Sequence, residues 1–211
     1  MKTDDCFALV SAGDLFPEDI AKIRQEGFIA AADAGYRYLF ENGIRPDLII
    51  GDFDSAKRPD TDSELIQLPV EKDDTDTVYC VKEGLKRGYR KFHLYGALGG
   101  KRLSHTFANL QLLSMIKDHG AEAEIISGPV RVFLIGSGES RVFPETLTGT
   151  ISFFSVSQEA CVTLEGFQYE LDHGMLDRRF PLGVSNHFTG KPAQAVVHEG
   201  EILAVLEEGL L

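Results

Sequence analysis

The stretch LIIGDFDSAK, residues 48–57, joins an apolar run to two closely spaced acids. The run 48–50 is apolar throughout, without the alternation of a half-exposed strand, and this predicts a strand buried on both faces. Asp52 and Asp54 follow at once. Because alternate side chains of an extended segment point the same way, we expect both carboxylates to face one point while Phe53 turns back to the core.

Strand-like and helix-like segments alternate along residues 1–127. Such an alternation predicts a parallel sheet with helices on both of its faces. The expected strands are CFALVSAG (6–13), FIAAADAG (28–35), DLIIGD (47–52), KFHLYGALGG (91–100) and AEIISG (123–128). The expected helices, with apolar residues at helical spacing and a glycine near the end, are YRYLFENG (36–43), TDTVYCVKEGLKRG (75–88) and SHTFANLQLLSMIKDHG (104–120).

The sequence pattern changes after about residue 127. The remaining apolar segments are short, rich in β-branched and aromatic residues, and divided by glycine turns, as in VRVFLIGSGESRVF (130–143) and CVTLEGFQYEL (161–171). We therefore expect an α/β protein with two domains. A three-layer αβα parallel-sheet domain spans 1–127, and an antiparallel β-sandwich domain follows over 128–211.

Composition excludes several classes of function. The 211-residue chain carries a formal net charge of −12, and no run of Lys and Arg in it could supply the basic face that a nucleic-acid binder normally shows. No segment approaches the roughly 18 apolar residues of a membrane span. The start, MKTDDCFALV, places two acids before a short apolar run, unlike a secretory signal. We expect a cytoplasmic protein whose three separated cysteines are buried thiols.

Acidic residues follow several of the expected strands directly. Asp33, Asp52 and Asp54 all do so, as does the loop 96–102. The carboxyl ends of parallel strands lie at one edge of a sheet, where ligands bind, so these residues should meet there. Carboxylates about 4 Å apart repel by about 4 kcal/mol per pair at an effective dielectric near 20. Some of them therefore stay protonated or a divalent cation neutralises them, and an oxygen-only ligand set suits Mg²⁺.

The same acids also have structural interpretations. Asp73, Asp74 and Asp76 stand just ahead of the helix expected at 75–88, where carboxylates commonly cap a helix and complement its dipole. Asp33 has a glycine two residues on, so a role in a turn is open. For Asp52 and Asp54, the pattern favours a functional role over a structural one, because no helix follows them at once.

A glycine-rich loop with two cations, GALGGKRLSHTFANL (96–110), precedes the last expected helix of the first domain. Glycines let the backbone approach a ligand, helix N-termini favour phosphate, and Arg102 can grip phosphate with two hydrogen bonds. His105 is either a base or a structural group at the helix start. Together with the acids, the loop predicts metal-assisted phosphoryl chemistry without naming a substrate.

The order of these motifs resembles that of the thiamine pyrophosphokinase family. The segments that carry the resemblance are AADAG (31–35), RPDLIIGDFDS (45–55), KDDTD (72–76), GGKRLSHTFAN (99–109), GFQYEL (166–171) and GVSN (183–186). They run in order across nearly the whole chain. GDFDS followed by DDTD at this separation is the most specific part of the set.

The resemblance implies a reaction and a site. Diphosphate would pass from ATP to thiamine, giving thiamine diphosphate and AMP, in a homodimer whose active sites lie between subunits. It implies that Asp52, Asp54 and Asp76 hold Mg²⁺ with the phosphates. It also implies catalytic roles for Asp33, Asp73 and Arg102, nucleotide contacts from Ser55, Thr75, Gly99, Gly100, Arg102 and His105, and thiamine contacts from Asp33, Ser185 and Asn186.

The chain departs from the family pattern at three positions. Ser104 replaces the usual aspartate before the histidine, Lys101 lengthens the loop by one residue, and Leu182 stands near where animal members place a tryptophan. If the usual aspartate caps the helix, serine replaces it well. If that aspartate holds metal or takes a proton, either the protein is slow or Asp73 or Asp74 is recruited in its place. Two alternatives stay open: a diphosphokinase for another hydroxyalkyl heterocycle such as a pterin, and a non-catalytic thiamine or nucleotide sensor.

Overall fold

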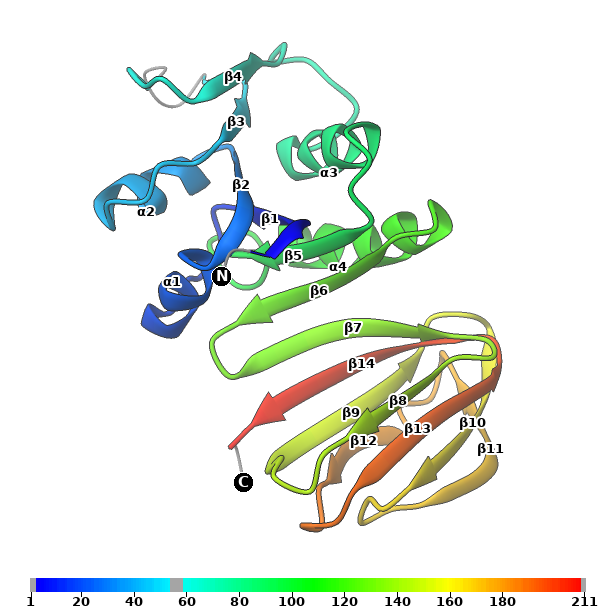
Figure 1. Cartoon of the computed structure of the whole chain (residues 1–211). Helices are drawn as coiled ribbons and strands as arrows, with labels where there is room; N and C mark the ends of the chain where they lie inside the picture. The colour runs from blue at the N-terminus through cyan, green and yellow to red at the C-terminus, as the bar shows by residue number, and fades with distance from the viewer. Residues whose placement is uncertain (1–2, 54–58, 210–211) are drawn as a thin grey trace. The chain divides into compact units, whose positions relative to one another are not determined.

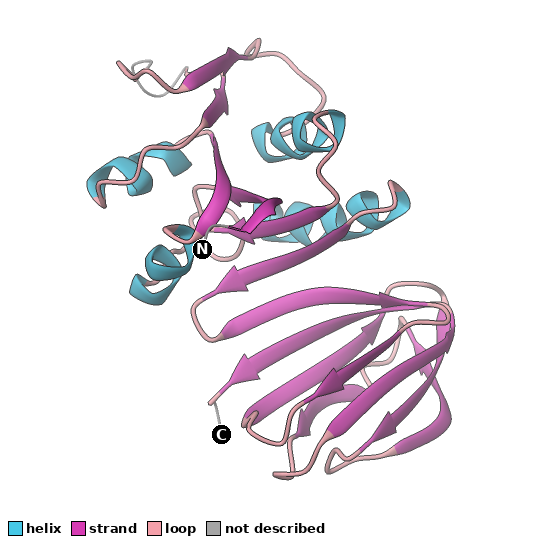
Figure 2. Cartoon of the chain, in the orientation of Figure 1, coloured by secondary structure: helices cyan, strands magenta, loops and turns pink. Residues whose placement is uncertain are grey.

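The computed structural model describes residues 3–53 and 59–209, which form two compact units, Met1–Gly128 and Pro129–Leu211. In the first unit a parallel sheet lies between two layers of helices (Figures 1 and 2). Its strands are β1 (Thr3–Val10), β2 (Glu26–Ala32), β3 (Leu48–Gly51), β4 (Glu64–Gln67), β5 (Lys91–Tyr95) and β6 (Glu122–Ser127), in the spatial order β6-β5-β1-β2-β3-β4. Its helices are α1 (Pro17–Ile23), α2 (Gly35–Glu41), α3 (Asp76–Lys86) and α4 (Leu103–Asp118).

Every strand and helix expected in the first half of the sequence is present, and two more elements join them. Helix α1 begins at a proline, and the side chain of Asp19 accepts a hydrogen bond from the N–H of Phe16 (3.1 Å). This is a start signal that the sequence already carries. Strand β4 is short and lies at the sheet edge, partly exposed, so its sequence lacks the apolar run of the buried strands.

The two helical layers cover opposite faces of the sheet (Figure 1). On one face, Ile23 of α1 and Leu39 of α2 are buried against small strand residues such as Ala8 and Ala31. On the other face, α3 packs over β1, β2 and β3 and contacts α4. Helix α3 approaches closely because Gly84 has no side chain: a Cβ there would lie 2.7 Å from the ring of Phe92.

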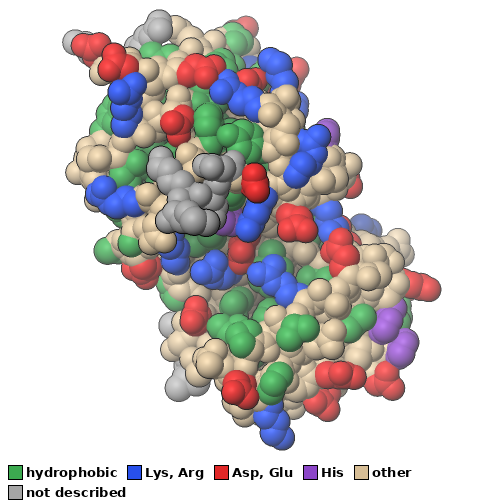
Figure 3. All heavy atoms as spheres, in the orientation of Figure 1, with side chains coloured by type: hydrophobic (Ala, Val, Ile, Leu, Met, Phe, Trp, Pro, Cys, Tyr) green, Lys and Arg blue, Asp and Glu red, His purple; other side chains and the backbone are tan. Residues whose placement is uncertain are grey.

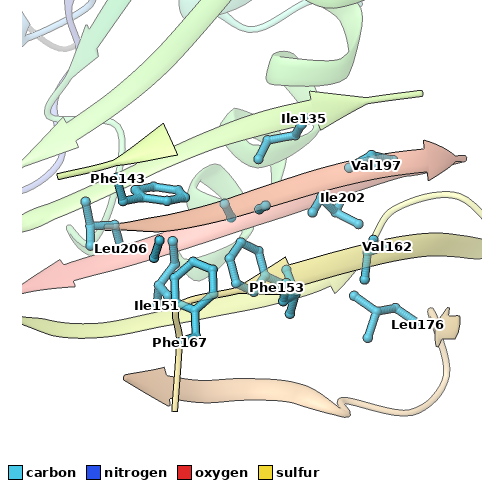
Figure 4. Packing of buried hydrophobic residues seen from close by; sticks show 14 of the residues in the cluster. Ile135, Phe143, Ile151, Phe153, Val162, Phe167, Leu176, Val197, Ile202 and Leu206 are labelled. Carbon is cyan, nitrogen blue, oxygen red and sulfur yellow. The ribbon is translucent and has the colours of Figure 1, made fainter. Parts of the chain in front are cut away.

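The second unit is a sandwich of two antiparallel sheets. Its strands are β7 (Val130–Gly136), β8 (Ser140–Phe143), β9 (Gly149–Ser155), β10 (Glu159–Glu165), β11 (Leu171–Asp177), β12 (Gly183–His187), β13 (Ala193–Glu199) and β14 (Glu201–Glu208). One sheet has the order β12-β9-β14-β7 and the other β11-β10-β13-β8. Alternate side chains of both sheets meet in an apolar core that includes Phe153, Ile202, Val162 and Val197 (Figure 4). The expected α/β fold class, with its β-sandwich half, is confirmed.

No helix in the described residues is both long and apolar enough to cross a membrane. On the face drawn in Figure 3, acidic and basic side chains are interspersed. Cys6 and Cys80 are buried free thiols, as expected, whereas Cys161 is only partly buried, so the expectation is wrong for that residue. Burial raises the pKa of Cys6 to about 12. That thiol is therefore neutral at physiological pH.

A polar cluster lies inside the first unit beside Cys6. The carboxylate of Glu26, a residue only 4% exposed, accepts a hydrogen bond from the hydroxyl of Tyr95 (2.8 Å), and Nδ1 of His93 lies 2.7 Å from the same oxygen. Ligand atoms of Cys6, Glu26 and His93 all lie within 4.8 Å of one another. Burial by itself raises the pKa of Glu26, but the hydrogen bonds from His93 and Tyr95 outweigh it and hold the pKa below its usual value.

Because the pKa of Glu26 is lower in the folded chain than in the unfolded one, ionisation of Glu26 stabilises the fold above about pH 4.5, and this contribution disappears as pH falls. We expect Glu26→Gln to lower the free energy of unfolding at pH 7 by about 1–3 kcal/mol, with a smaller loss at pH 4. Urea unfolding at both pH values measures it. The exposed Glu71→Gln is the control, and an equal loss at both pH values would contradict the assignment.

Candidate functional site

The order of the strands defines where a ligand can enter the first unit. From β1 the chain moves through β2 and β3 to β4 on one side, and β5 and β6 then lie on the other side of β1. Open parallel sheets bind ligands outside the carboxyl ends of their strands at such a reversal. Here the reversal lies between β1 and β5. The two loops that flank it are residues 11–14 and residues 96–100.

These two loops are joined by backbone hydrogen bonds. The N–H of Gly13 donates to the carbonyl of Gly96 (2.7 Å), and the N–H of Asp14 donates to the carbonyl of Leu98 (2.9 Å). In return, the N–H of Gly100 donates to the Asp14 carboxylate (3.1 Å). Sequence analysis missed Asp14, although it follows a strand and a glycine just as Asp52 does.

Asp52 and Asp76 lie close to one cation. Nζ of Lys72 is 2.7 Å from Oδ2 of Asp52 and 2.9 Å from Oδ1 of Asp76. The three side chains are 9–16% exposed. Burial alone lowers the pKa of Lys72, but its hydrogen bonds to Asp52 and Asp76 outweigh burial and raise that pKa. The structure therefore brings together one acid that follows β3 and another that begins α3, as their motifs predict, and adds a lysine that sequence analysis did not single out.

Asp33 lies beside the end of the neighbouring strand. Its N–H donates to the carbonyl of Ile50 (2.9 Å), and its backbone is left-handed, with φ of 49°. The backbone of Phe53 is also left-handed, with φ of 55°, so the expected extended geometry after β3 is wrong. The expected direction of the Phe53 side chain is correct, since it packs on the core beside Tyr36. Asp54 and Ser55 lie outside the described residues.

The acids before α3 do not cap it. Thr75 is the N-cap, its hydroxyl accepting a hydrogen bond from the N–H of Val78 (3.3 Å). Capping by any of the three aspartates is therefore wrong, although Asp76, in the first turn of α3, is placed to complement the helix dipole. Asp74 pairs with Lys82 (2.5 Å), whereas Asp73 is exposed and has no partner among the described residues.

Helix α4 begins two residues earlier than a capping Ser104 requires. Arg102 occupies the N-cap position without a side-chain cap, and Ser104 is the second helical residue, exposed to solvent. The expectation that this serine caps the helix is wrong. Arg102 and His105 are also exposed, next to Gly99 and Gly100. Their side chains are therefore accessible to a ligand at the loop 96–102.

In the second unit, the side chain of Asn186 is hydrogen-bonded to the backbone of another segment. Asn186 is 4% exposed, accepts a hydrogen bond from the N–H of Tyr169 (2.9 Å) and donates to the carbonyl of the same residue (2.7 Å). Its amide thus binds the GFQYEL segment to β12. Ser185 has φ of 56° and an exposed side chain, and its N–H donates to the hydroxyl of Ser152 (3.0 Å). Of the two residues, Ser185 is the one that a ligand can reach.

The acid pair fits a hard divalent ion. Its donors are carboxylate oxygens, the ligands that Mg²⁺ prefers. Oδ1 of Asp76 is buried, and no described residue except Lys72 gives it a cationic or hydrogen-bonding partner. The ammonium group of Lys72 marks a position at which both carboxylates can contact one positive charge.

Comparison with known proteins identifies the family to which the chain is similar. The family model described as "Thiamin pyrophosphokinase, catalytic domain" matches residues 21–125, and "Thiamin pyrophosphokinase, vitamin B1 binding domain" matches residues 141–200. No curated protein sequence matches. Thiamin pyrophosphokinase from Geobacillus thermodenitrificans is similar in structure, with 26% identity, a TM-score of 0.82, and coverage of 96% of this chain and 97% of the other.

Two further solved structures share the fold. Thiamine pyrophosphokinase from Bacillus subtilis has 21% identity, a TM-score of 0.85, and coverage of 97% of this chain and 100% of the other. The Candida albicans enzyme has 17% identity, a TM-score of 0.81, and coverage of 97% and 90%. The two family models together span most of the sequence in the order of its two units. The chain belongs to the thiamin pyrophosphokinase family.

Proposed function

We propose that this protein is a Mg²⁺-dependent thiamine diphosphokinase, which transfers the terminal diphosphate of ATP to the hydroxyethyl oxygen of thiamine and releases AMP. The observation that carries the proposal is the sharing of one cation by Asp52 and Asp76, at the sheet edge where proteins of this architecture bind nucleotides. Membership of the family supplies the substrates. Nothing in the site or the comparisons favours the pterin or sensor alternatives.

Different residues of the chain would bind the metal, orient the phosphates and accept the proton. Asp52 and Asp76, with Asp54 by resemblance, would hold Mg²⁺, which when bound neutralises charge on the phosphate oxygens. Arg102 and the backbone N–H groups of the loop 96–102 would orient the triphosphate, and most of the rate enhancement would come from this positioning. Asp73, exposed and without a partner among the described residues, is better placed than the paired Asp74 to accept the hydroxyl proton.

The proposal includes a homodimer with its active sites between subunits. Several large apolar side chains of the second unit are exposed: Tyr169 (59%), Phe180 (66%), Leu182 (53%) and Val184 (45%). Several large apolar side chains that are exposed close to one another indicate a surface that binds another protein or a ligand. A partner subunit and the thiamine ring together would account for it, with Ser185 on the thiamine side. The buried free thiols of Cys6 and Cys80 are compatible with the reducing cytoplasm.

Product analysis tests the proposed function. The protein is incubated with ATP, thiamine and Mg²⁺, and nucleotides and thiamine esters are separated by chromatography. We expect AMP and thiamine diphosphate in equal amounts, and neither product with EDTA. ADP in place of AMP, or no AMP above background, would contradict the proposal. A hydroxymethyl pterin replaces thiamine in a parallel reaction, and AMP formed only in that reaction would favour the alternative substrate.

The substitution Ser104→Asp restores the residue usual in the family. Because Ser104 is exposed in the first turn of α4, a carboxylate there should interact favourably with the helix dipole and raise the free energy of unfolding by about 0.3–1 kcal/mol. We expect kcat to change less than about threefold, since Asp52 and Asp76, the acids proposed to hold the metal, are unchanged and the substituted side chain is exposed. Thermal unfolding and steady-state kinetics measure both effects. A tenfold gain in kcat would show that the site works best with a carboxylate at this position.

A further inference from the structure

The surroundings of Lys72 differ from those of Lys82, the lysine that pairs with the neighbouring Asp74. The ammonium of Lys72 contacts two carboxylates and also donates to the carbonyl of Pro69 (3.2 Å), and its side chain is 9% exposed. Among the described residues Lys82 pairs with Asp74 alone, and the two side chains are 52% and 30% exposed. An exposed pair contributes little to stability, whereas loss of a partly buried cation leaves the acids that it contacts without a counter-charge.

The two oxygen atoms that Lys72 contacts belong to the acids proposed to bind the metal. An ammonium at 2.7 and 2.9 Å takes the place next to those oxygens that a divalent ion would need. Each oxygen has further lone pairs, but a divalent ion and an ammonium that share the same two oxygens would repel each other at close range. Lys72 and the metal must therefore compete, or one of them must move when the other arrives.

We propose that Lys72 is an internal counter-ion of the metal site: it holds Asp52 and Asp76 together before the metal binds, and it lowers the affinity for free divalent ions by competing with them. The metal would displace the ammonium when the phosphates of the nucleotide add their own ligands. The inference rests on the proposed function for the role of the two acids. It adds a positioning residue that limits metal binding in the absence of nucleotide.

Binding of Mn²⁺ to the whole protein without nucleotide tests this inference. Free Mn²⁺ is measured by electron paramagnetic resonance for the unmodified protein, Lys72→Met and the matched control Lys82→Met. We expect Lys72→Met to bind Mn²⁺ at least tenfold more tightly, because the competitor is gone and two acids remain. Lys82→Met should stay within twofold of the unmodified protein. A lysine that served only to hold the acids in place would give the opposite change, a loss of affinity.

Thermal unfolding gives a second readout. Without metal, Lys72→Met should unfold about 3–6 °C lower than the unmodified protein, because two partly buried carboxylates lose their cation. Mn²⁺ should restore most of this loss. Lys72→Gln, which keeps a polar side chain, should show the same direction of both effects and serves if Lys72→Met does not fold.

Unchanged or weaker Mn²⁺ binding in a folded Lys72 variant would overturn the inference. The outcome is separable from that of the proposed function. An unmodified protein that makes no AMP would refute the diphosphokinase, whatever its Mn²⁺ affinity. An active enzyme whose Mn²⁺ affinity does not respond to Lys72 would refute only the counter-ion.

Discussion

Asp52→Asn and Asp76→Asn should each lower kcat for diphosphate transfer by about 10²- to 10³-fold, the loss typical when one preorganised charge-stabilising group is removed. Each substitution takes a charged ligand from the proposed metal position. The fold should persist, because Lys72 keeps the other carboxylate as its partner, at 2.9 Å or 2.7 Å. Steady-state kinetics at saturating Mg²⁺ and circular dichroism measure the two effects.

Asp74→Asn is the matched control for both variants. Asp74 lies in the same motif but pairs with the exposed Lys82. We expect its kcat to stay within about threefold of the unmodified enzyme, as is usual for exposed pairs. If Asp52→Asn or Asp76→Asn retained most of the activity, the metal assignment would be wrong. If all three variants lost activity equally, the acids would act through their summed charge rather than by coordination.

Gly35→Ala should be the most destabilising of the single-methyl additions in the first unit's motifs. Gly35 begins α2 directly above the end of β1, and a Cβ there would lie 2.1 Å from the carbonyl oxygen of Val10. The three atoms nearest to that position all belong to the backbone of Val10 and Ser11, so moving a side chain aside cannot relieve the contact. We expect a loss of about 3 kcal/mol in the free energy of unfolding, at the upper end for overpacking. Nucleotide affinity should fall as well, since Ser11 begins a loop of the proposed site.

Gly43→Ala, just beyond the other end of α2, is the control. Gly43 has φ of 64° with no atom within 4 Å of a built Cβ, so alanine there meets only conformational strain of about 1 kcal/mol. Gly35 does not have a positive φ. Conformational preference alone therefore predicts that Gly43→Ala is the worse substitution, and close packing predicts the reverse order. Denaturant unfolding of the two variants distinguishes these explanations.

The fold could be predicted from the sequence wherever burial sets the pattern. Continuous apolar runs such as Leu48–Ile50 identify central strands of a parallel sheet, because helices cover both faces. The partly exposed edge strand β4 carries no such run, and α1 lacks the glycine just past its end that marks the equally short α2. The exact starts of α3 and α4 were also beyond the sequence pattern, since several polar residues compete for each cap. Thr75, which has four polar neighbours, occupies the N-cap position of α3. Arg102 occupies the N-cap position of α4.

The site could be predicted where sheet topology alone brings residues together. Asp33 and Asp52 follow adjacent parallel strands, so their proximity follows from the fold. The position of Lys72 depends instead on the irregular path between β4 and α3, which no periodicity describes. The role of Asn186 was likewise hidden, because its two hydrogen bonds reach a segment 17 residues away. The positions and contacts of such residues depend on tertiary structure, so the sequence pattern did not predict them.

A crystal structure with Mn²⁺, thiamine and a non-hydrolysable ATP analogue tests the central claim most directly. The account predicts an anomalous Mn²⁺ peak about 2.0–2.3 Å from carboxylate oxygens of both Asp52 and Asp76, with Nζ of Lys72 withdrawn from that pair. The phosphates of the analogue should lie between this ion and the loop 96–102. A metal bound elsewhere, with Lys72 still bridging the two aspartates, would contradict the account.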